Sequence, residues 1–447
     1  MASLTYSSAD GDPAPDHSTS PTRVQWLLAL FALILTSKAI LMLILTGGER
    51  ATIDLAEGSP LFQVLCAMVY ASCALFAVRR RNAMRHYLRS NVPLLLLLAV
   101  AVASIAWSVQ PGISLRRVIA LLGTTTVGFF LATHFSYEQL VRLLVHFFSV
   151  ILLASVVMTI VSPDLAIHSD EFHAGAWRGA FAHKNNLGEA MALAVPVFLL
   201  AIRDRVSARG PLVLALLASI GFLAMSGSKA SILSSAAALC VLPLLGASRL
   251  PLRIALPFGA VAGSLFLSIA TYTALHFEEL LLAFGRDLTL TGRTVLWQAA
   301  IFAGMDNPLL GVGYRAFWLG EDGGVGVLGT LASSFALTID HGHNGFLDLW
   351  LELGVPGLAL FLIVLVGYAR ASSRFAIEGI RASALLPLVF VVLLVPISFA
   401  TTVILDRNNY IWILFVTFLL YSRESGRSRP GPSFVSPSLP AQPHGTP

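Results

Sequence analysis

The stretch from residue 276 to 350 contains three polar segments: GRTVLWQ (292–298), DNPLLGVGYRAFW (306–318) and DHGHNGFLDLW (340–350). It is the longest polar insertion in a chain that otherwise consists largely of apolar segments, and a long apolar segment lies on each side of it. A polar segment of this length without a continuous apolar helix is expected outside a bilayer. Any chemistry is therefore expected within this stretch or facing it.

Composition predicts a membrane protein. The 447 residues are 56% hydrophobic and 12% charged, whereas soluble domains carry about 25% charged residues. The net charge of +5 comes from short basic clusters between apolar segments, which is the pattern of topology signals and argues against nucleic-acid binding. The three cysteines lie in apolar segments without pairing or metal-ligand spacing, so no disulfide framework is expected.

Apolar segments of about 20 residues can cross a bilayer as helices. The sequence predicts an all-α, polytopic integral membrane protein with about twelve such helices. The predicted spans are residues 24–46, 60–78, 92–109, 115–133, 141–161, 187–202, 211–225, 230–246, 252–275, 346–368, 382–403 and 410–421. The resulting organisation is a disordered N-terminus (1–23), nine helices (24–275), one large periplasmic loop (276–344), three helices (345–421) and a disordered tail (422–447).

The positions of Lys and Arg predict the orientation, because cytoplasmic loops carry the excess of positive charge. Basic clusters occupy alternate connections, for example residues 79–89 and 203–209, and basic residues also lie before the first span and after the last. Both termini are therefore predicted to be cytoplasmic. The loop 276–344 is then periplasmic, and the protein is expected in the inner membrane of a bacterium.

Several cations do not follow this rule. The predicted outer ends and loops, and the first span, contain Lys38, Arg50, Arg116, Arg117, Arg178, Lys184, Lys229, Arg286, Arg293, Arg315 and Arg407. Outward cations oppose correct insertion, so a set of them suggests that they hold an anion. The alternative is that several of these cations only extend to the membrane surface or pair with Asp287, Asp306, Glu321 or Asp406.

The segment WRGAFAHKNNLGEA (177–190) lies before the sixth predicted span. Arg178, His183, Lys184 and Asn185 supply hydrogen-bond donors beside a helix expected to begin near Asn186, whose free amide groups favour anions. The segment can therefore cradle a phosphate group. The alternative is an Asn-capped helix start with a solvated loop.

The segment GRTVLWQAAIFAG (292–304) has apolar residues at helical spacing from Val295 to Ala303, including Phe302. It predicts an amphipathic helix at the outer surface, with Arg293 in its first turn. Arg293 is a candidate anion ligand. An equally consistent alternative is a surface anchor whose arginine contacts lipid headgroups.

The segment HGHNGFLDLWLELGVPG (341–357) predicts a helix that begins near Asn344, with Asp348 and Glu352 on one face. His343 precedes that helix on the predicted outer side. A neutral histidine can accept a proton from a hydroxyl group near pH 7. The alternative role for His343 is hydrogen bonding beside the helix cap.

The ordered set of motifs resembles the superfamily of O-antigen ligases and polysaccharide polymerases, including exopolysaccharide polymerases. The residues that carry the resemblance are RGAFAHKNNLG (178–188), GSKA (227–230), GRTVLW (292–297), NPLLGVGYRAFW (307–318) and HNGFLDLWLELGVPG (343–357). Lys229 stands where relatives often have arginine, which weakens any two-pronged phosphate contact at that position.

The resemblance implies a fold of the GT-C type and a glycosyltransferase that uses no metal and no cofactor. Its donor would be a glycan on undecaprenyl pyrophosphate, and its acceptor a sugar hydroxyl on a glycan or lipid-linked glycan. The implied catalytic residue is His343, and the implied pyrophosphate ligands are Arg178 and Arg293. Lys184, Arg315 and Arg116 are further pyrophosphate candidates, chosen because they are outward cations.

The sequence leaves several functions open. A polymerase that extends lipid-linked repeat units and a ligase that moves finished O-antigen to lipid A-core share this mechanism, and the HKNNLG run favours the polymerase. A transporter or flippase for lipid-linked glycan also fits the number of spans, although transporters usually show paired repeats. A non-catalytic membrane scaffold is a third class. A regulator of chain length is left open as a partner.

Overall fold

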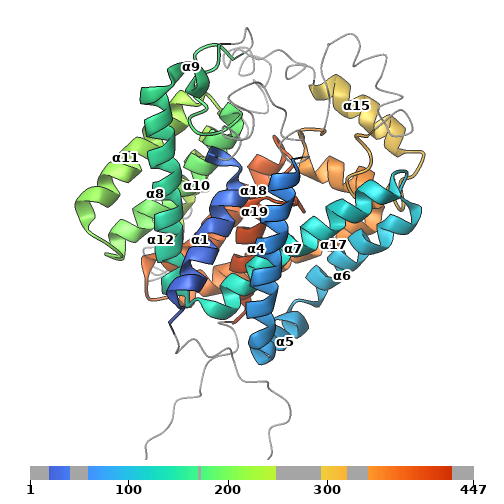
Figure 1. Ribbon diagram of the computed structural model, residues 1–447, viewed down its shortest axis with the longest axis horizontal. Helices are drawn as coiled ribbons and strands as arrows, with labels where there is room; N and C mark the ends of the chain where they lie inside the picture. Colours follow the sequence, from blue (N-terminus) through green and yellow to red (C-terminus); the bar gives the residue numbers. More distant parts are fainter. Residues whose placement is uncertain (1–19, 41–58, 170–172, 248–292, 320–340, 425–447) are drawn as a thin grey trace, which may run out of the picture.

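The computed structural model describes residues 20–40, 59–169, 173–247, 293–319 and 341–424. Within these residues the regular structure is helical, apart from one isolated antiparallel bridge between Ile167 and Trp177. The predicted all-α class is confirmed (Figure 1).

The helices follow the apolar segments closely. They are α1 (Arg23–Ser37), α4 (Pro60–Arg79), α5 (Arg81–Ser90), α6 (Val92–Ala103), η1 (Ser104–Trp107), α7 (Pro111–His134), α8 (Tyr137–Val161), α9 (Pro163–Ala166), α10 (Lys184–Arg203), α11 (Arg209–Met225), α12 (Lys229–Ala247), α15 (Arg293–Gly304), α17 (Gly345–Glu378), η2 (Ala382–Leu385), α18 (Leu386–Ser398) and α19 (Tyr410–Glu424).

Five of the described helices, namely α4, α7, α8, α10 and α17, are long and apolar enough to cross a membrane, and the bent pair α5 and α6 would make six. Shorter apolar helices, among them α1, α11, α18 and α19, lie where the sequence predicts the other spans. The polytopic class is thus confirmed, whereas the number twelve stays a prediction. Several predicted segments lie outside the described residues: 41–46 of the first span, Arg50, the ninth span 252–275, most of the periplasmic loop including Arg286, and most of both termini.

Two predicted boundaries shift by a few residues. Thr22 and Gln25 form a reciprocal capping box, so that α1 begins at Arg23 inside the segment 1–23 that was predicted to be disordered. At the other end α19 continues to Glu424, past the predicted boundary at residue 421. Capping and helix continuation add local order that hydropathy alone does not register.

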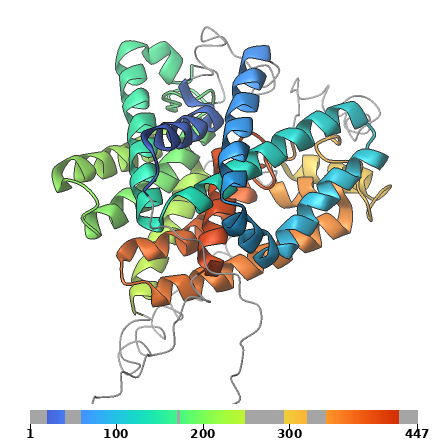
Figure 2. The same ribbon diagram turned by 60° about the horizontal axis from the view of Figure 1, so that its bottom comes forward.

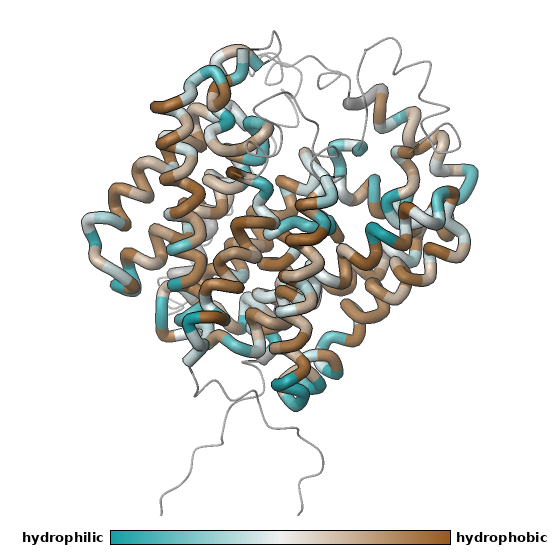
Figure 3. Tube along the Cα trace, in the orientation of Figure 1, coloured by the Kyte–Doolittle hydropathy of each residue, from teal (hydrophilic) through white to brown (hydrophobic). Residues whose placement is uncertain are grey.

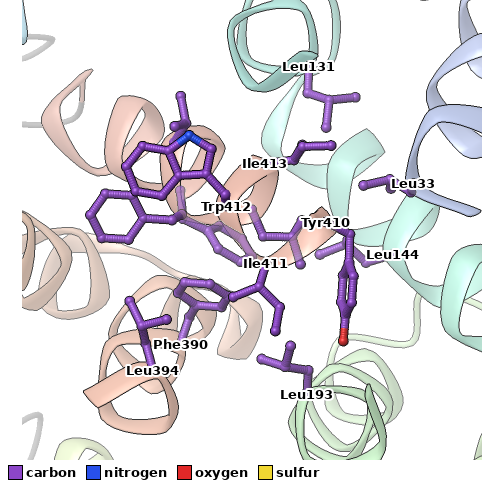
Figure 4. Close-up of a cluster of buried hydrophobic side chains, with 14 of the residues drawn as sticks. Leu33, Leu131, Leu144, Leu193, Phe390, Leu394, Tyr410, Ile411, Trp412 and Ile413 are labelled. Atoms are coloured by element: carbon purple, nitrogen blue, oxygen red, sulfur yellow. The ribbon is translucent and has the colours of Figure 1, made fainter. Parts of the chain in front are cut away.

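The core of the molecule is organised around α19. Figures 1 and 2 both show this helix in the middle of the bundle, where it packs against α1, α7, α17 and α18. Every residue from Tyr410 to Ser422 is buried, as expected for a helix that is apolar on all sides. Figure 4 shows part of this core, with Leu33 of α1, Leu144 of α8 and Leu193 of α10 around it.

Close packing of α19 on α7 depends on small and polar residues of α7. A Cβ atom at Gly128 would lie 2.8 Å from Val416, so only glycine allows the two helices to approach this closely. The indole of Trp412 donates to the hydroxyl of Thr125 (2.9 Å), and the Tyr421 hydroxyl donates to the carbonyl of Phe135 (2.5 Å). Helix α19, which corresponds to the short last predicted span, therefore lies at the centre of the packing.

The periphery of the bundle is apolar, as a bilayer requires. Large apolar side chains are exposed along α4 (Leu61, Val64, Met68, Leu75) and along α8 (Leu153, Val157, Ile160, Val161). Figure 3 shows hydrophobic residues along the helices and hydrophilic residues gathered toward their ends. In water such a surface would be an interaction site, whereas in a membrane it faces lipid.

The long helix α17 is broken at Gly354, where φ is 65° and ψ is −162°. Pro356 has no N–H group, so the carbonyl of Glu352 cannot receive its usual helical hydrogen bond. The segment 305–319 supplies the missing partners: Val312 N–H donates to Leu351 O (3.0 Å), Gly313 N–H to Glu352 O (2.9 Å), and Val355 N–H to Pro308 O (3.2 Å). The break therefore anchors this segment to α17.

We expect Gly354→Ala to lower the apparent melting temperature of the purified protein in detergent. The alanine Cβ would collide with the carbonyl of Leu309, and φ and ψ at this position suit only glycine, a strain of about 1–3 kcal/mol. Gly221→Ala on α11 is the matched control, because a Cβ there meets no atom within 4 Å. Equal melting temperatures for the two variants would contradict the role given to the break.

Candidate active site

The start of α17 fixes the position of His343. The side-chain oxygen of Asn344 accepts hydrogen bonds from the N–H groups of Phe346 (3.1 Å) and Leu347 (3.2 Å), which confirms the predicted helix start. His343 directly precedes this cap, and its backbone has a φ of 49°, which is uncommon for a residue with a side chain. The cap and the turn together determine where the imidazole can lie.

Asp348 holds the three residues 341–343, which we call the histidine turn. Its carboxylate is 1% exposed and accepts the N–H of Gly342 (3.0 Å), the indole N–H of Trp318 (3.0 Å) and the hydroxyl of Thr402. These three donors come from three separate segments of the chain. A buried carboxylate with several donors is a rigid anchor.

Two further contacts complete the histidine turn. The N–H of His343 donates to Nδ1 of His341 (3.2 Å), and the two rings meet edge to face with centroids 4.0 Å apart. The indole of Trp297 in α15 donates to the carbonyl of Gly342 (2.7 Å). The histidine turn is thus held by α15, α17 and the segment 305–319.

Arg315 lies in a second fixed turn, GVGYR (311–315). Gly313 and Arg315 have φ values of 102° and 55°. The Tyr314 hydroxyl donates to Leu405 O (2.6 Å), and its N–H donates to the hydroxyl of Ser104 (3.0 Å). Arg117 of α7 donates to the carbonyl of Arg315. These hydrogen bonds fix the backbone of residues 314 and 315, and with it the point from which the Arg315 side chain extends.

The Arg315 guanidinium forms an ion pair with Asp406 (2.5 Å), and the two side chains are only 11% and 14% exposed. Burial acts to lower the pKa of Arg315, but the charge of Asp406, and then that of Glu352, outweighs it and raises the pKa well above its ordinary value. The guanidinium is therefore charged at every physiological pH. Part of its charge is already balanced by these carboxylates.

Residues 399–409, which we call the α18–α19 loop, join the two turns. Thr402 binds Asp348, Leu405 O binds Tyr314, and Asp406 binds Arg315. At its far end Asn408 accepts the Tyr70 hydroxyl (2.5 Å) through its side chain and donates its N–H to Thr124 (2.9 Å). The loop therefore couples the histidine turn to α4 and α7.

Arg178 and Lys184 lie on a different set of elements. The guanidinium of Arg178 donates to the carbonyls of Leu165 (2.6 Å) and Ala182 (3.3 Å). Lys184 is the first residue of α10, whose cap is His183 and accepts the N–H of Asn185 (3.2 Å). The helix begins two residues before the predicted start near Asn186. The alternative of an asparagine cap is wrong, because the His183 imidazole takes the capping role.

Helix α10 also lies against the α18–α19 loop. Glu189, five residues after Lys184, is 5% exposed, and its carboxylate hydrogen-bonds the Thr401 side chain within the field of Asp406 and Lys38. An ionisable side chain buried in a membrane protein is costly and is usually retained for function. The α18–α19 loop is thus a common neighbour of α10, the histidine turn and Arg315.

A group of three histidines was not predicted. His168, His173 and His183 lie with ring centroids 5.2 to 5.4 Å apart, beside the start of α10. Nε2 of His168 accepts the N–H of Lys184 (3.2 Å). The three histidines occur within 16 residues of sequence, which is the signal that could have revealed them. Among the described residues no group of three His, Cys, Asp or Glu is arranged to hold a metal ion.

The remaining candidates differ in exposure. Arg293 is the first residue of α15 and lies one turn before Trp297, which binds the histidine turn. The predicted helix in the segment 292–304 is confirmed. Of its predicted apolar face, Leu296, Ala299 and Ala303 pack against a small buried cluster, whereas Phe302 is 74% exposed. On α7, Arg116 is exposed while its neighbour Arg117 reaches Arg315. Arg407 is 9% exposed.

Fold and site together define an all-α, polytopic membrane protein with a fixed histidine turn, a buried ion pair between Arg315 and Asp406, and several buried carboxyl groups. Residues 214–362 match the O-Antigen ligase family model. The chain is also similar to the exopolysaccharide production protein ExoQ of Rhizobium meliloti (strain 1021), with 34% identity over 283 residues. That match covers 60% of this chain and 61% of the relative. This chain therefore spans about three fifths of the length of the relative. The predicted superfamily is confirmed.

We expect Asp348→Ala to destabilise the protein more than Asp348→Asn. Alanine would leave the N–H of Gly342, the indole of Trp318 and the hydroxyl of Thr402 without their acceptor, at about 1–3 kcal/mol for each buried donor. Asparagine keeps one oxygen acceptor. Apparent melting temperatures should therefore rank wild type, then asparagine, then alanine. Asp164→Ala, at an exposed position of α9, is the control and should change the melting temperature little. If Asp348→Ala had the same melting temperature as this control, the role of Asp348 as an anchor would be refuted.

A double-mutant cycle tests the buried ion pair. Arg315→Met alone and Asp406→Asn alone should each lower the melting temperature, because each leaves one buried charge without its partner. The double variant should lose less than the sum of the two. The exposed pair Arg381–Glu138 (2.8 Å, 50% and 47% exposed) is the control and should show almost no coupling. Additive losses at Arg315 and Asp406 would contradict a coupled pair.

Proposed function

We propose that the protein is a glycosyltransferase that moves a glycan from undecaprenyl pyrophosphate to an acceptor sugar hydroxyl at the periplasmic face of the inner membrane. We further propose that it extends exopolysaccharide chains. The family match of residues 214–362 and the similarity to a Rhizobium exopolysaccharide production protein support this assignment. Both termini would be cytoplasmic, and the acceptor would be a glycan or a lipid-linked glycan.

The observation that carries the proposal is the histidine turn. His343 lies at a helix start that is fixed by Asn344, Asp348 and Trp297, and a positioned base is what a sugar hydroxyl requires. Such a hydroxyl has a pKa far above 7, so it attacks efficiently only if its proton is removed as the new bond forms. In this proposal His343 takes that proton.

The leaving group is a diphosphate ester and needs charge stabilisation more than protonation. We propose that Arg178, Lys184 and Arg293 provide that charge without a metal or cofactor. Arg178 and Lys184 are supported by their place beside the start of α10, and Arg293 by its place one turn before Trp297. The transfer would break the bond between the anomeric carbon and the diphosphate oxygen, and form the new glycosidic bond.

Arg315 and Arg116 receive different roles. Because the Arg315 guanidinium is bound to Asp406, we propose that it acts mainly by holding the α18–α19 loop against the histidine turn, and adds positive potential near the diphosphate. Arg116 is exposed on α7, so its proposed role in diphosphate binding depends on a ligand that reaches this outer surface.

Reconstitution of the purified protein with a defined undecaprenyl-pyrophosphate glycan tests the function. We expect His343→Ala to reduce transfer by about 100-fold or more, the usual effect of losing a general base, while abundance and melting temperature stay near those of the wild type. His146→Ala, which removes an exposed histidine of α8, is the control. Wild-type turnover by His343→Ala would exclude the histidine as base, and no turnover by the wild type would refute the transferase.

The same assay separates the alternative functions. A polymerase would elongate a lipid-linked repeat unit, whereas a ligase would need a lipid A-core acceptor. A flippase would show no glycan transfer in detergent, where the two faces of the membrane are not separated. The similarity to an exopolysaccharide production protein favours the polymerase.

A further inference from the structure

The segment between residues 60 and 134 contains seven arginines and no aspartate or glutamate. Five of the arginines lie between residues 79 and 89, around the short helix α5. A positive-inside signal requires only a few basic residues of either kind. The exclusive use of arginine, without any carboxylate nearby in the sequence, suggests that this surface also binds something.

Helix α5 lies across the end of the bundle. It is bent by 87° from the segment that follows it, Val92–Trp107, so if that segment crosses the membrane, α5 lies along the membrane surface. Figure 1 shows α5 at the end of the molecule where α1 begins, and Figure 3 shows hydrophilic residues there. Its side chains are therefore at the level of the lipid headgroups.

One face of α5 is fastened to the protein. His86 and Tyr87 are buried, and the Tyr87 hydroxyl donates to Ala132 O of α7 (3.2 Å). Arg423 of α19 donates to the carbonyl of Ser90 at the end of α5 (2.8 Å). These contacts fix the rotation of α5 about its axis.

The opposite face carries Arg81, Arg85 and Arg89, which we call the arginine row. They are spaced four residues apart and all three are exposed. Like charges at this spacing repel one another and weaken a helix. The arginine row is thus unfavourable for α5 on its own, and an anion bound across it would relieve the repulsion. Because the buried face is fixed, the row cannot turn away from the surface.

We propose that the arginine row binds the headgroup phosphates of anionic phospholipids in the leaflet at this end of the bundle. The planar guanidinium group suits phosphate, because it can donate two parallel hydrogen bonds. The row extends over about 12 Å along the membrane surface, which allows more than one phosphate to bind. Clusters of basic residues next to membrane spans typically recognise such lipids.

The test uses the full-length protein in a neutral detergent, titrated with phosphatidylglycerol or with phosphatidylcholine and followed by native mass spectrometry. We expect the wild type to prefer phosphatidylglycerol. Replacing Arg81, Arg85 and Arg89 by glutamine should weaken that binding on the order of 100-fold, at about fivefold for each arginine. High salt should reduce the wild-type preference, because the contacts are at the surface.

Two control variants make the result specific. Arg203→Gln, Arg205→Gln and Arg209→Gln together remove the same charge from another exposed basic cluster, and should retain binding within about fivefold. Replacing the arginine row by lysine should preserve most of the affinity. Equal melting temperatures in phosphatidylcholine would show that the glutamine variant is folded; if it is not, the lysine variant and the salt titration decide.

Three results would overturn the proposal. The first is equal binding of the two lipids by the wild type. The second is an equal loss in the glutamine variants of both clusters, which would indicate diffuse charge. The third is undiminished phosphatidylglycerol binding without the arginine row, which would assign this face to a different occupant such as an acidic protein segment.

Discussion

A missing N–H group is the constraint on which the candidate site depends. In a membrane every backbone carbonyl needs a partner within the protein, and Pro356 deprives Glu352 of its helical partner. The segment 305–319 meets this requirement through Val312 and Gly313. Once that segment is anchored, Arg315 faces Asp406, Tyr314 reaches Leu405, and the α18–α19 loop is drawn against α17. Thr402 and Trp318 then donate hydrogen bonds to Asp348, which in turn accepts the N–H of Gly342 in the histidine turn.

Backbone strain gathers at the same place. Among the described residues six that are not glycine have a positive φ, and four of them are His343, Arg315, Leu405 and Asn408. Each such residue costs on the order of 1–3 kcal/mol and persists only where its surroundings fix it. Here the surroundings are the hydrogen bonds of Asp348, Tyr314 and Thr124. Strained turns held in this way are typical of pre-organised sites, which supports the choice of His343 as the reacting residue.

Hydropathy and capping rules predicted much of the local structure from the sequence. The helix start at Asn344, the amphipathic helix 293–304 and the positions of the described apolar helices follow from short-range patterns. The long-range pairs could not be predicted, because nothing in the sequence shows that residue 312 meets 351 or that 315 meets 406. For Arg315 the sequence left open an anion, the membrane surface or any of several carboxylates, and it did not single out Asp406. The exposure of Phe302 depends on which face of α15 meets α17.

The central place of α19 has a consequence for biosynthesis. A membrane protein is inserted in chain order, so α1, α4, α7 and α8 enter the bilayer long before residues 410–424 are made. Their buried surfaces include Gly128 and Thr125, which await Val416 and Trp412. Until then, lipid or a membrane chaperone would have to cover the surfaces of these helices that α19 later contacts. Assembly of the bundle is thus delayed until synthesis has passed residue 424, and a stop before residue 410 would leave the buried faces of α1 and α7 without their central partner.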